Sequence, residues 1–267
     1  MVQHVIARPR SLALRPFISS LHYHESEFGM AVERILPNAQ AHLMINLEQD
    51  EFRTYGGADF RTMHRTSGAV LAGPHGRFTG IDTAEQRNLV AVEFKPGGAA
   101  AFMRMPLNEA SNQIVEVSEF WGREGCVLRE RLCEAPTPSA KLRTLEAILL
   151  NHLVNTYDRQ ILCAVSLLDG GMPIAETRSR LGFLPKTFVR RFQQYVGLTP
   201  KRLARVRRLQ RIVGSVVGRT KVDWCLIAAE HGYTDQAHLI HDFRDLAGIT
   251  PAAYRPSSAQ RRNHINV

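Results

Sequence analysis

The chain has 267 residues, of which 44% are hydrophobic and 22% are charged. This composition supports one large or two ordinary folded domains and excludes disordered and collagen-like classes. Its apolar runs are far shorter than the roughly 20 residues that span a bilayer, and no N-terminal run resembles a signal peptide. We therefore expect a cytoplasmic protein. The four cysteines lack the spacing of a zinc site and the density of a disulfide framework, which indicates reduced thiols.

The basic residues are concentrated in the last third of the chain. Residues 159–262 hold 18 Lys and Arg against 7 Asp and Glu, whereas the remainder holds 16 against 18. A basic surplus confined to one segment favours a polyanionic partner, although weak nonspecific binding would leave the same charge.

The first part of the chain has the texture of short strands and turns. From Leu12 to Phe94, a Gly, Pro, Asn or Asp interrupts the chain every several residues, and apolar stretches such as 42–47 and 89–94 stand between these breaks. A turn then passes into residues of good helix propensity, so that residues 95–103 predict one helix that closes the strand region.

A helix with a leucine face follows a short linker. Residues 135–139 contain two prolines, and after them leucines recur at 3- and 4-residue steps, which predicts a helix over about 140–155. This face could mediate dimerisation or pack on its own domain, and we favour the second.

The last part of the chain contains an internal repeat. Residues 180–183 (RLGF) recur 50 residues later as residues 230–233 (EHGY), and residues 197–200 (GLTP) recur 51 residues later as residues 248–251 (GITP). Both copies share one design, which predicts two structural units of the same kind.

Each copy has the pattern of a helix, a glycine turn and a second helix. Gly182 and Gly232 stand where the first helix must end in a positive-φ conformation. Pro185 suits the first turn of one second helix, and Thr234 with Asp235 behind it suits the N-cap of the other.

The second helix of each copy separates apolar from polar residues. Phe188 and Phe192, and likewise Leu239 and Phe243, are four residues apart and share an inner face. The outward side chains are suited to base edges and phosphates. In the first copy they are Lys186, Thr187, Arg190 and Arg191, and in the second copy they are Gln236, His238, His241 and Arg244. Between the copies, residues 201–211 predict a basic helix whose arginines either touch phosphates or form a solvated face.

Residues from about 161 to 255 resemble the DNA-binding domain of the AraC/XylS family of bacterial regulators. The second copy carries the family's signature in residues 227–243 and 248–254. The first copy departs from it, with Thr177 and Arg178 in place of a common Leu-Ala pair and Leu184 in place of a capping Ser. We expect looser docking of its second helix. The resemblance implies two recognition helices in successive major-groove faces, roughly 34 Å apart.

The N-terminal part also resembles, more loosely, a domain found ahead of this module in a subset of such regulators. The similarity rests on residues 34–38, 42–47, 73–74 and 94–102, and it implies effector sensing or dimerisation. The predicted fold class is α+β, a β-rich, barrel-like domain with closing helices followed by an all-α domain with two helix-turn-helix units. The expected divisions are a sensor or regulatory domain (1–135), a linker and connecting helix (136–158), an AraC-type DNA-binding domain (159–258) and a flexible tail (259–267).

Two other candidate sites have ordinary explanations. His22 and His24 lie two apart near two glutamates, as in a cupin-type metal site, but the acid spacing does not match and no second motif follows. We favour surface or packing histidines. Residues 96–98 could cradle an anion, although a close-packing turn is the better interpretation.

We therefore expect a transcription regulator with no cofactor and no metal. Since no nucleophile motif is present, we also expect no enzymatic activity. One alternative is a metal-dependent, cupin-like enzyme domain fused to a DNA-binding module, and another is a dimerisation domain without a ligand. Double-stranded DNA is the expected partner. The sequence leaves open whether the protein contacts RNA polymerase, whether it binds a small-molecule effector and whether it is a monomer or a homodimer. It also leaves open the operator and the sign of regulation.

Overall fold

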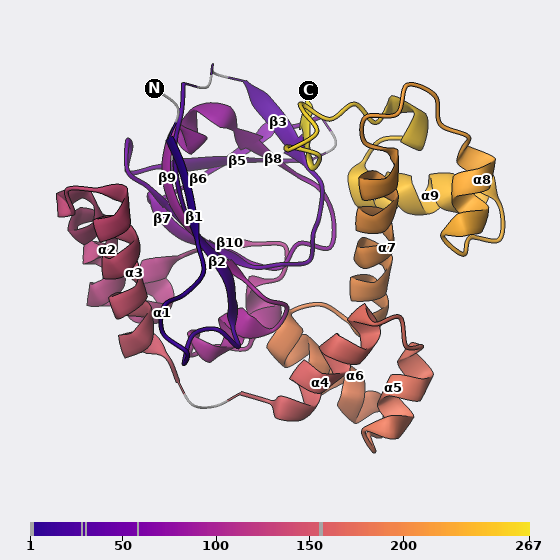
Figure 1. Ribbon diagram of the computed structural model, residues 1–267, viewed down its shortest axis with the longest axis horizontal. Helices are drawn as coiled ribbons and strands as arrows, with labels where there is room; N and C mark the ends of the chain where they lie inside the picture. The colour runs from indigo at the N-terminus through magenta and orange to yellow at the C-terminus, as the bar shows by residue number, and fades with distance from the viewer. Residues whose placement is uncertain (1–2, 28, 30, 58, 155–156) are drawn as a thin grey trace.

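The computed structural model describes residues 3–27, 29, 31–57, 59–154 and 157–267. An N-terminal β domain precedes a helical domain, as predicted, and a long helix of the second domain runs beside the first (Figure 1). Within the described residues, no helix is long and apolar enough to cross a membrane.

The strands of the described residues form two antiparallel sheets. The first sheet has, in spatial order, β1 (Gln3–Ala7), β2 (Ile18–Glu25), β9 (Asn88–Phe94), β4 (His42–Asn46), β7 (Ala69–Ala72) and β10 (Ile114–Glu116). The second has β11 (His264–Asn266), β3 (Val32–Ile35), β8 (Thr79–Asp82), β5 (Phe52–Gly56) and β6 (Thr62–Thr66). Three 3-10 turns accompany them, η1 (Thr83–Gln86), η2 (Gly98–Ala101) and η3 (Leu107–Ala110).

Three helices cover one face of the first sheet. They are α1 (Val117–Trp121), α2 (Arg123–Glu134) and α3 (Pro138–His152). Alternate residues of β9 and three leucines of α3, Leu142, Leu145 and Leu149, lie in one apolar core, with Val92 and Leu145 both at 0% exposure. The leucine face of α3 therefore packs on its own domain, as favoured from the sequence.

Two local predictions need correction. The helix expected from residue 140 begins at Pro138, because Thr137 accepts a hydrogen bond from the amide of Ala140 and Pro138 suits the first turn; its expected end at Asn155 lies outside the described residues. The helix expected over 95–103 is only the short turn η2. A Cβ at Gly98 would collide with the backbone of Phe17, so this segment is a close-packing turn.

The second domain is helical throughout its described core. Its elements are α4 (Arg159–Asp169), α5 (Ile174–Arg180), α6 (Pro185–Val196), α7 (Pro200–Val216), α8 (Trp224–Glu230), α9 (Gln236–Ala247) and η4 (Pro251–Ala253). The long helix α7 joins two helix pairs, one at each of its ends (Figure 1).

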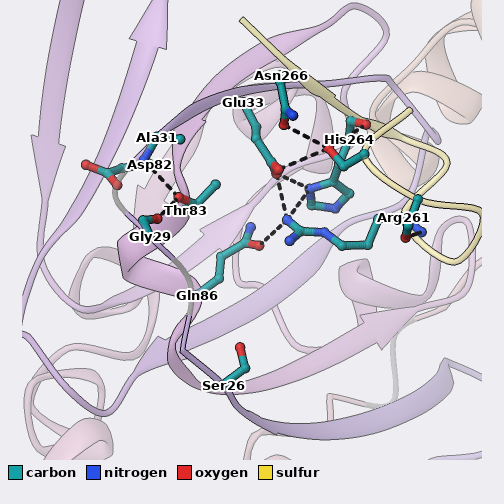
Figure 2. A network of polar contacts seen from close by, with 12 residues as sticks. Ser26, Gly29, Ala31, Glu33, Asp82, Thr83, Gln86, Arg261, His264 and Asn266 are labelled. Atoms are coloured by element: carbon teal, nitrogen blue, oxygen red, sulfur yellow. Dashed lines mark hydrogen bonds and ion pairs between the residues drawn. The ribbon is translucent and has the colours of Figure 1, made fainter. Parts of the chain in front are cut away.

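The C-terminal tail, expected to be flexible, instead returns to the β domain. Its strand β11 pairs with β3, and Ile265 is buried at 6% exposure. Figure 2 shows the polar contacts beside it: Arg261 donates to Glu33 at 2.6 Å, and His264 Nδ1 lies 2.8 Å from the same carboxylate. The carboxylate of a residue some 230 positions earlier fixes the tail, and no local pattern in residues 259–267 contains that information.

Candidate nucleic-acid interface and the cavity of the β domain

Two helix-turn-helix units are built alike from α5 with α6 and from α8 with α9. Gly182 and Gly232 both have φ of +71°, as their place in the repeat predicts, and nothing lies within 4 Å of the Cβ that either could carry. Backbone conformation alone therefore accounts for glycine at both turns.

The caps of the two recognition helices differ. Helix α6 begins with Pro185 behind Leu184, whose side chain makes no capping hydrogen bond. Helix α9 is capped by Asp235, which accepts from the amide of His238 at 2.7 Å. The predicted cap at Thr234 is therefore wrong by one residue, because Asp235 has the extended backbone and the carboxylate that reach this amide.

Both recognition helices are docked through the predicted apolar pairs. Phe188 and Phe192 have exposed fractions of 1% and 0%, and Leu239 and Phe243 have 0% and 1%. The looser docking expected for the first unit is not seen at these positions, since Phe188 also packs between two other rings of its cluster.

Most of the predicted outward residues are exposed to solvent. In α6 these are Lys186 and Arg190, whereas Thr187 is half-buried. In α9 all four predicted residues are exposed, namely Gln236, His238, His241 and Arg244. The two helices thus present a cationic and polar surface of the kind that contacts phosphates and base edges.

Arg191 is placed differently from the other seven. Its Nε donates to Asp158 at 2.8 Å, its Nη1 donates to Gln160, and its guanidinium lies 4.8 Å from the ring centre of Phe183. Asp158 is also the N-cap of α4. Arg191 therefore ties the recognition helix to the start of the domain.

Two further residues belong to the outward face of α6. Val189 and Gln193 line, with Lys186 and Arg190, a cleft of about 690 Å³ whose other wall is η3 with Glu109. The spacing of these four residues, three and four apart, is the signal in the sequence that would have found them. Val189 is 40% exposed, and an apolar side chain there is suited to a thymine methyl group.

The arginines of α7 mostly pair within the protein. Arg205 donates to Asp242 at 2.5 Å and to Asp245 at 2.6 Å, and Arg207 pairs with Asp169 at 3.1 Å. Asp242 is 4% exposed and also accepts from the hydroxyl of Tyr233 at 2.8 Å. These pairs hold α9 and α4 against α7, whereas contact between the basic helix and phosphates stays a prediction.

Residues 73–78, which we call the crossover loop, pass from β7 in the first sheet to β8 in the second and contact the helical domain. A Cβ at Gly197, the C-cap of α6, would collide with the ring of Pro74. Arg202, in the first turn of α7, donates from Nε to the carbonyl of Gly76 at 2.9 Å.

The end of the same loop contacts the second unit. The amide of Phe78 donates to the carbonyl of Leu246 at 2.8 Å, and a Cβ at Gly248 would collide with the Phe78 ring. The guanidinium of Arg34 lies over the same ring, 4.9 Å from its centre. One short loop of the β domain therefore touches the end of each recognition helix.

A cavity of about 230 Å³ lies between the two sheets of the β domain. Both sheets contribute apolar side chains to its wall, including Met44, Phe52, Val70, Ile81 and Leu89. The tail contributes Asn263 and His264, so that a segment of the helical domain closes part of the wall.

The polar wall of the cavity contains neutral histidines and the guanidinium of Arg77. Burial lowers the pKa of His42 to about 4. Burial also lowers the pKa of His75, against the raising effect of its contact with the Gly73 carbonyl. Both rings are therefore uncharged near neutral pH. In the part of the chain that the structure describes, Arg77 makes no hydrogen bond or ion pair, whereas Arg53 on the same wall is held by Glu85 at 2.8 Å.

The histidines of β2 have protein partners. His22 Nε2 lies 2.7 Å from the Ser20 hydroxyl and 3.6 Å from Glu93, and His24 lies 2.7 Å from the Ser26 hydroxyl. Among the described residues, no group of three or more His, Cys, Asp or Glu could hold a metal ion.

Comparisons with known proteins agree with this architecture. A family model described as a helix-turn-helix domain matches residues 179–257, and one described as a domain of unknown function, DUF6597, matches residues 8–116. No curated protein matches in a sequence search.

Solved structures of ToxT from Vibrio cholerae are similar at low identity. The P21 crystal form has 10% identity and a TM-score of 0.45, over 95% of this chain and 97% of that one. Wild-type ToxT with a bound unsaturated fatty acid has 11% identity and a TM-score of 0.42, over 88% and 92%. The C-terminal part of the chain contains a helix-turn-helix domain, which the structure shows as two repeated units.

Proposed function

We propose that this protein is a sequence-specific transcription regulator that binds one DNA site through α6 and α9 and is controlled by its β domain. The observation that carries the proposal is the pair of helix-turn-helix units, each with its apolar side buried and its polar side exposed. We also propose that the protein is located in the cytoplasm, where a regulator of this kind would meet its DNA.

We assign the base and phosphate contacts to side chains on the outward faces of the two recognition helices. They are Lys186, Thr187, Val189, Arg190 and Gln193 in α6 and Gln236, His238, His241 and Arg244 in α9. Arg191 is left out of this set, because its guanidinium is held by Asp158.

Selection of bound genomic fragments by the purified full-length chain, followed by footprinting, tests the proposal. The expected result is a shared motif in a protected site of about two helical turns. Arg190→Ala and His241→Ala should each relax specificity at separate base pairs, whereas Arg143→Ala on the exposed side of α3 should not. Binding that depends on salt but shows no motif would reject sequence-specific regulation.

We further propose that the cavity between the sheets binds a compact, mainly apolar small molecule with an anionic group at Arg77. The apolar lining, the neutral histidines and the Arg77 guanidinium, which has no hydrogen bond or ion pair among the described residues, support this ligand chemistry. A thermal-shift screen of organic acids beside their neutral amides tests it. Acids should raise the melting temperature of the wild type and lose this effect in Arg77→Gln, and equal shifts by acids and amides would contradict the role of Arg77.

A further inference from the structure

We propose that the crossover loop transmits the state of the cavity to both helix-turn-helix units, so that filling the cavity changes DNA affinity. This inference rests on the proposed function and adds the route by which the β domain controls the recognition helices.

The residues of the crossover loop alternate between the two domains. Pro74, Gly76 and Phe78 contact the helical domain, whereas His75 and Arg77 between them line the cavity. Each cavity-lining residue is thus flanked on both sides by residues docked on the DNA-binding units. A shift of His75 or Arg77 is passed to these neighbours through the chain itself.

The first branch of this route leads to α6. Pro74 abuts Gly197 at the end of α6, and its carbonyl accepts from the amide of Asn112 at 3.3 Å. The side chain of Asn112 in turn accepts from the amide of Gly76 at 2.8 Å. Since η3 ends two residues before Asn112 and forms the far wall of the α6 cleft, the loop positions both the end of α6 and the surface opposite its outward face.

The second branch leads to α9. Phe78 is joined to Leu246 by a hydrogen bond between main chains, and its ring fills the space in which Gly248 would carry a Cβ. Gly248 has φ of +70° and ends α9. Its lack of a side chain therefore serves both the helix end and the contact with the loop.

The fit at both branches makes the coupling stiff. Gly197 and Gly248 occupy equivalent places in the two units, and each is packed so closely against the loop that a methyl group would not fit. Packed interfaces of this kind rearrange between discrete states rather than deform smoothly. A small displacement at the cavity is therefore expected to change the placement of the two recognition helices relative to each other.

The test uses the full-length chain without a ligand. Ala72→Leu places an apolar side chain in the cavity wall directly before the crossover loop, and Phe78→Ala removes the ring that docks on α9. These two variants, their double variant and the wild type are compared by hydrogen–deuterium exchange and by the Kd for the footprinted DNA. Ala147→Leu on the exposed side of α3 is the matched control.

Coupling predicts that Ala72→Leu changes exchange in residues 197–202 and 244–248 and changes Kd by about threefold or more. In the Phe78→Ala background the change in 244–248 should become smaller, because the ring contact with Gly248 is lost while the main-chain hydrogen bond to Leu246 remains, and the change in 197–202 should persist. Exchange and Kd equal to those of the wild type in Ala72→Leu would overturn the proposal.

A second variant keeps the test decisive if Ala72→Leu does not fold. Arg77→Gln alters the exposed, cavity-lining cation and should change exchange in the same two segments, whereas Arg10→Gln should not. Unchanged exchange in Arg77→Gln would then reject the coupling. If the wild type itself binds no DNA site, the proposed function fails, yet the exchange measurements still decide whether cavity and units are coupled.

Discussion

Two adjacent arginines of α6 have different surroundings, and replacing each by alanine should separate stability from DNA binding. Within the described residues Arg190 is exposed and makes no hydrogen bond or ion pair, whereas Arg191 is held by Asp158 and Gln160. Both substitutions remove one positive charge from the same turn of the same helix. Any general effect of charge on DNA affinity is therefore common to both.

Arg191→Ala should destabilise the protein. A hydrogen bond to a charged group contributes about 1.5–3 kcal/mol. The Arg191 side chain is 32% exposed, and Asp158, whose side chain is 5% exposed, keeps two backbone donors. After this discount for solvent and for the remaining donors, we expect a loss of about 1–2 kcal/mol in the free energy of unfolding.

Arg190→Ala should leave stability within about 0.5 kcal/mol, because it removes only solvent-exposed contacts. Loss of a contact to a base edge costs about 1–3 kcal/mol of binding, which corresponds to a Kd raised about 5- to 150-fold. The footprinted site and a variant of it with one changed base pair should then bind Arg190→Ala with more nearly equal affinity.

Urea denaturation followed by circular dichroism, and fluorescence anisotropy with labelled DNA, measure the two effects on the same preparations. The reasoning is refuted if Arg191→Ala unfolds like the wild type, or if Arg190→Ala binds its site as tightly as the wild type does.

Three further predictions concern other parts of the chain. Asp242→Asn should lower the free energy of unfolding by about 2–3 kcal/mol. Urea denaturation followed by the fluorescence of Trp224, which packs on Phe243, measures this loss. A loss below about 0.5 kcal/mol would contradict the buried pair of Asp242 and Arg205. Although burial alone would raise it, His264 and Arg261 hold the pKa of Glu33 below its ordinary value of 4.5. The stabilisation that ionised Glu33 provides is thus complete above its ordinary pKa and is lost as the pH falls through the lowered pKa. Glu33→Gln should therefore be less stable than the wild type at pH 7 and equally stable in acid. A difference in stability that does not change with pH would argue against the contact. If Lys186 contacts a phosphate, the slope of log Kd against the logarithm of the salt concentration should be smaller by about 1 in Lys186→Ala than in the wild type. An unchanged slope would disprove this contact.

The features that could be predicted from the sequence are those that local patterns determine. The glycine turns at Gly182 and Gly232 follow from a backbone conformation, and the buried pairs of α6 and α9 follow from their four-residue spacing. Both depend on neighbours within one or two turns of helix, which is the range over which periodicity is informative.

The remaining features depend on residues that are distant in the chain. Arg191 belongs to the outward set by periodicity, but its partner Asp158 lies 33 positions earlier. The cavity is assembled from strands of two sheets and from the tail, so no segment of the sequence shows it. The alternation within the crossover loop becomes visible only when both domains are in place.

The pairing of β11 with β3 also determines how the two domains can be studied apart. In a β domain expressed without the tail, β3 would become the edge of its sheet, with main-chain groups such as the amide of Leu36 deprived of their partner Asn263. Unpaired edge strands recruit other chains and promote aggregation. A fragment in which a Gly/Ser linker joins residues 257–267 to the end of the β domain should stay monomeric at concentrations where the plain fragment associates.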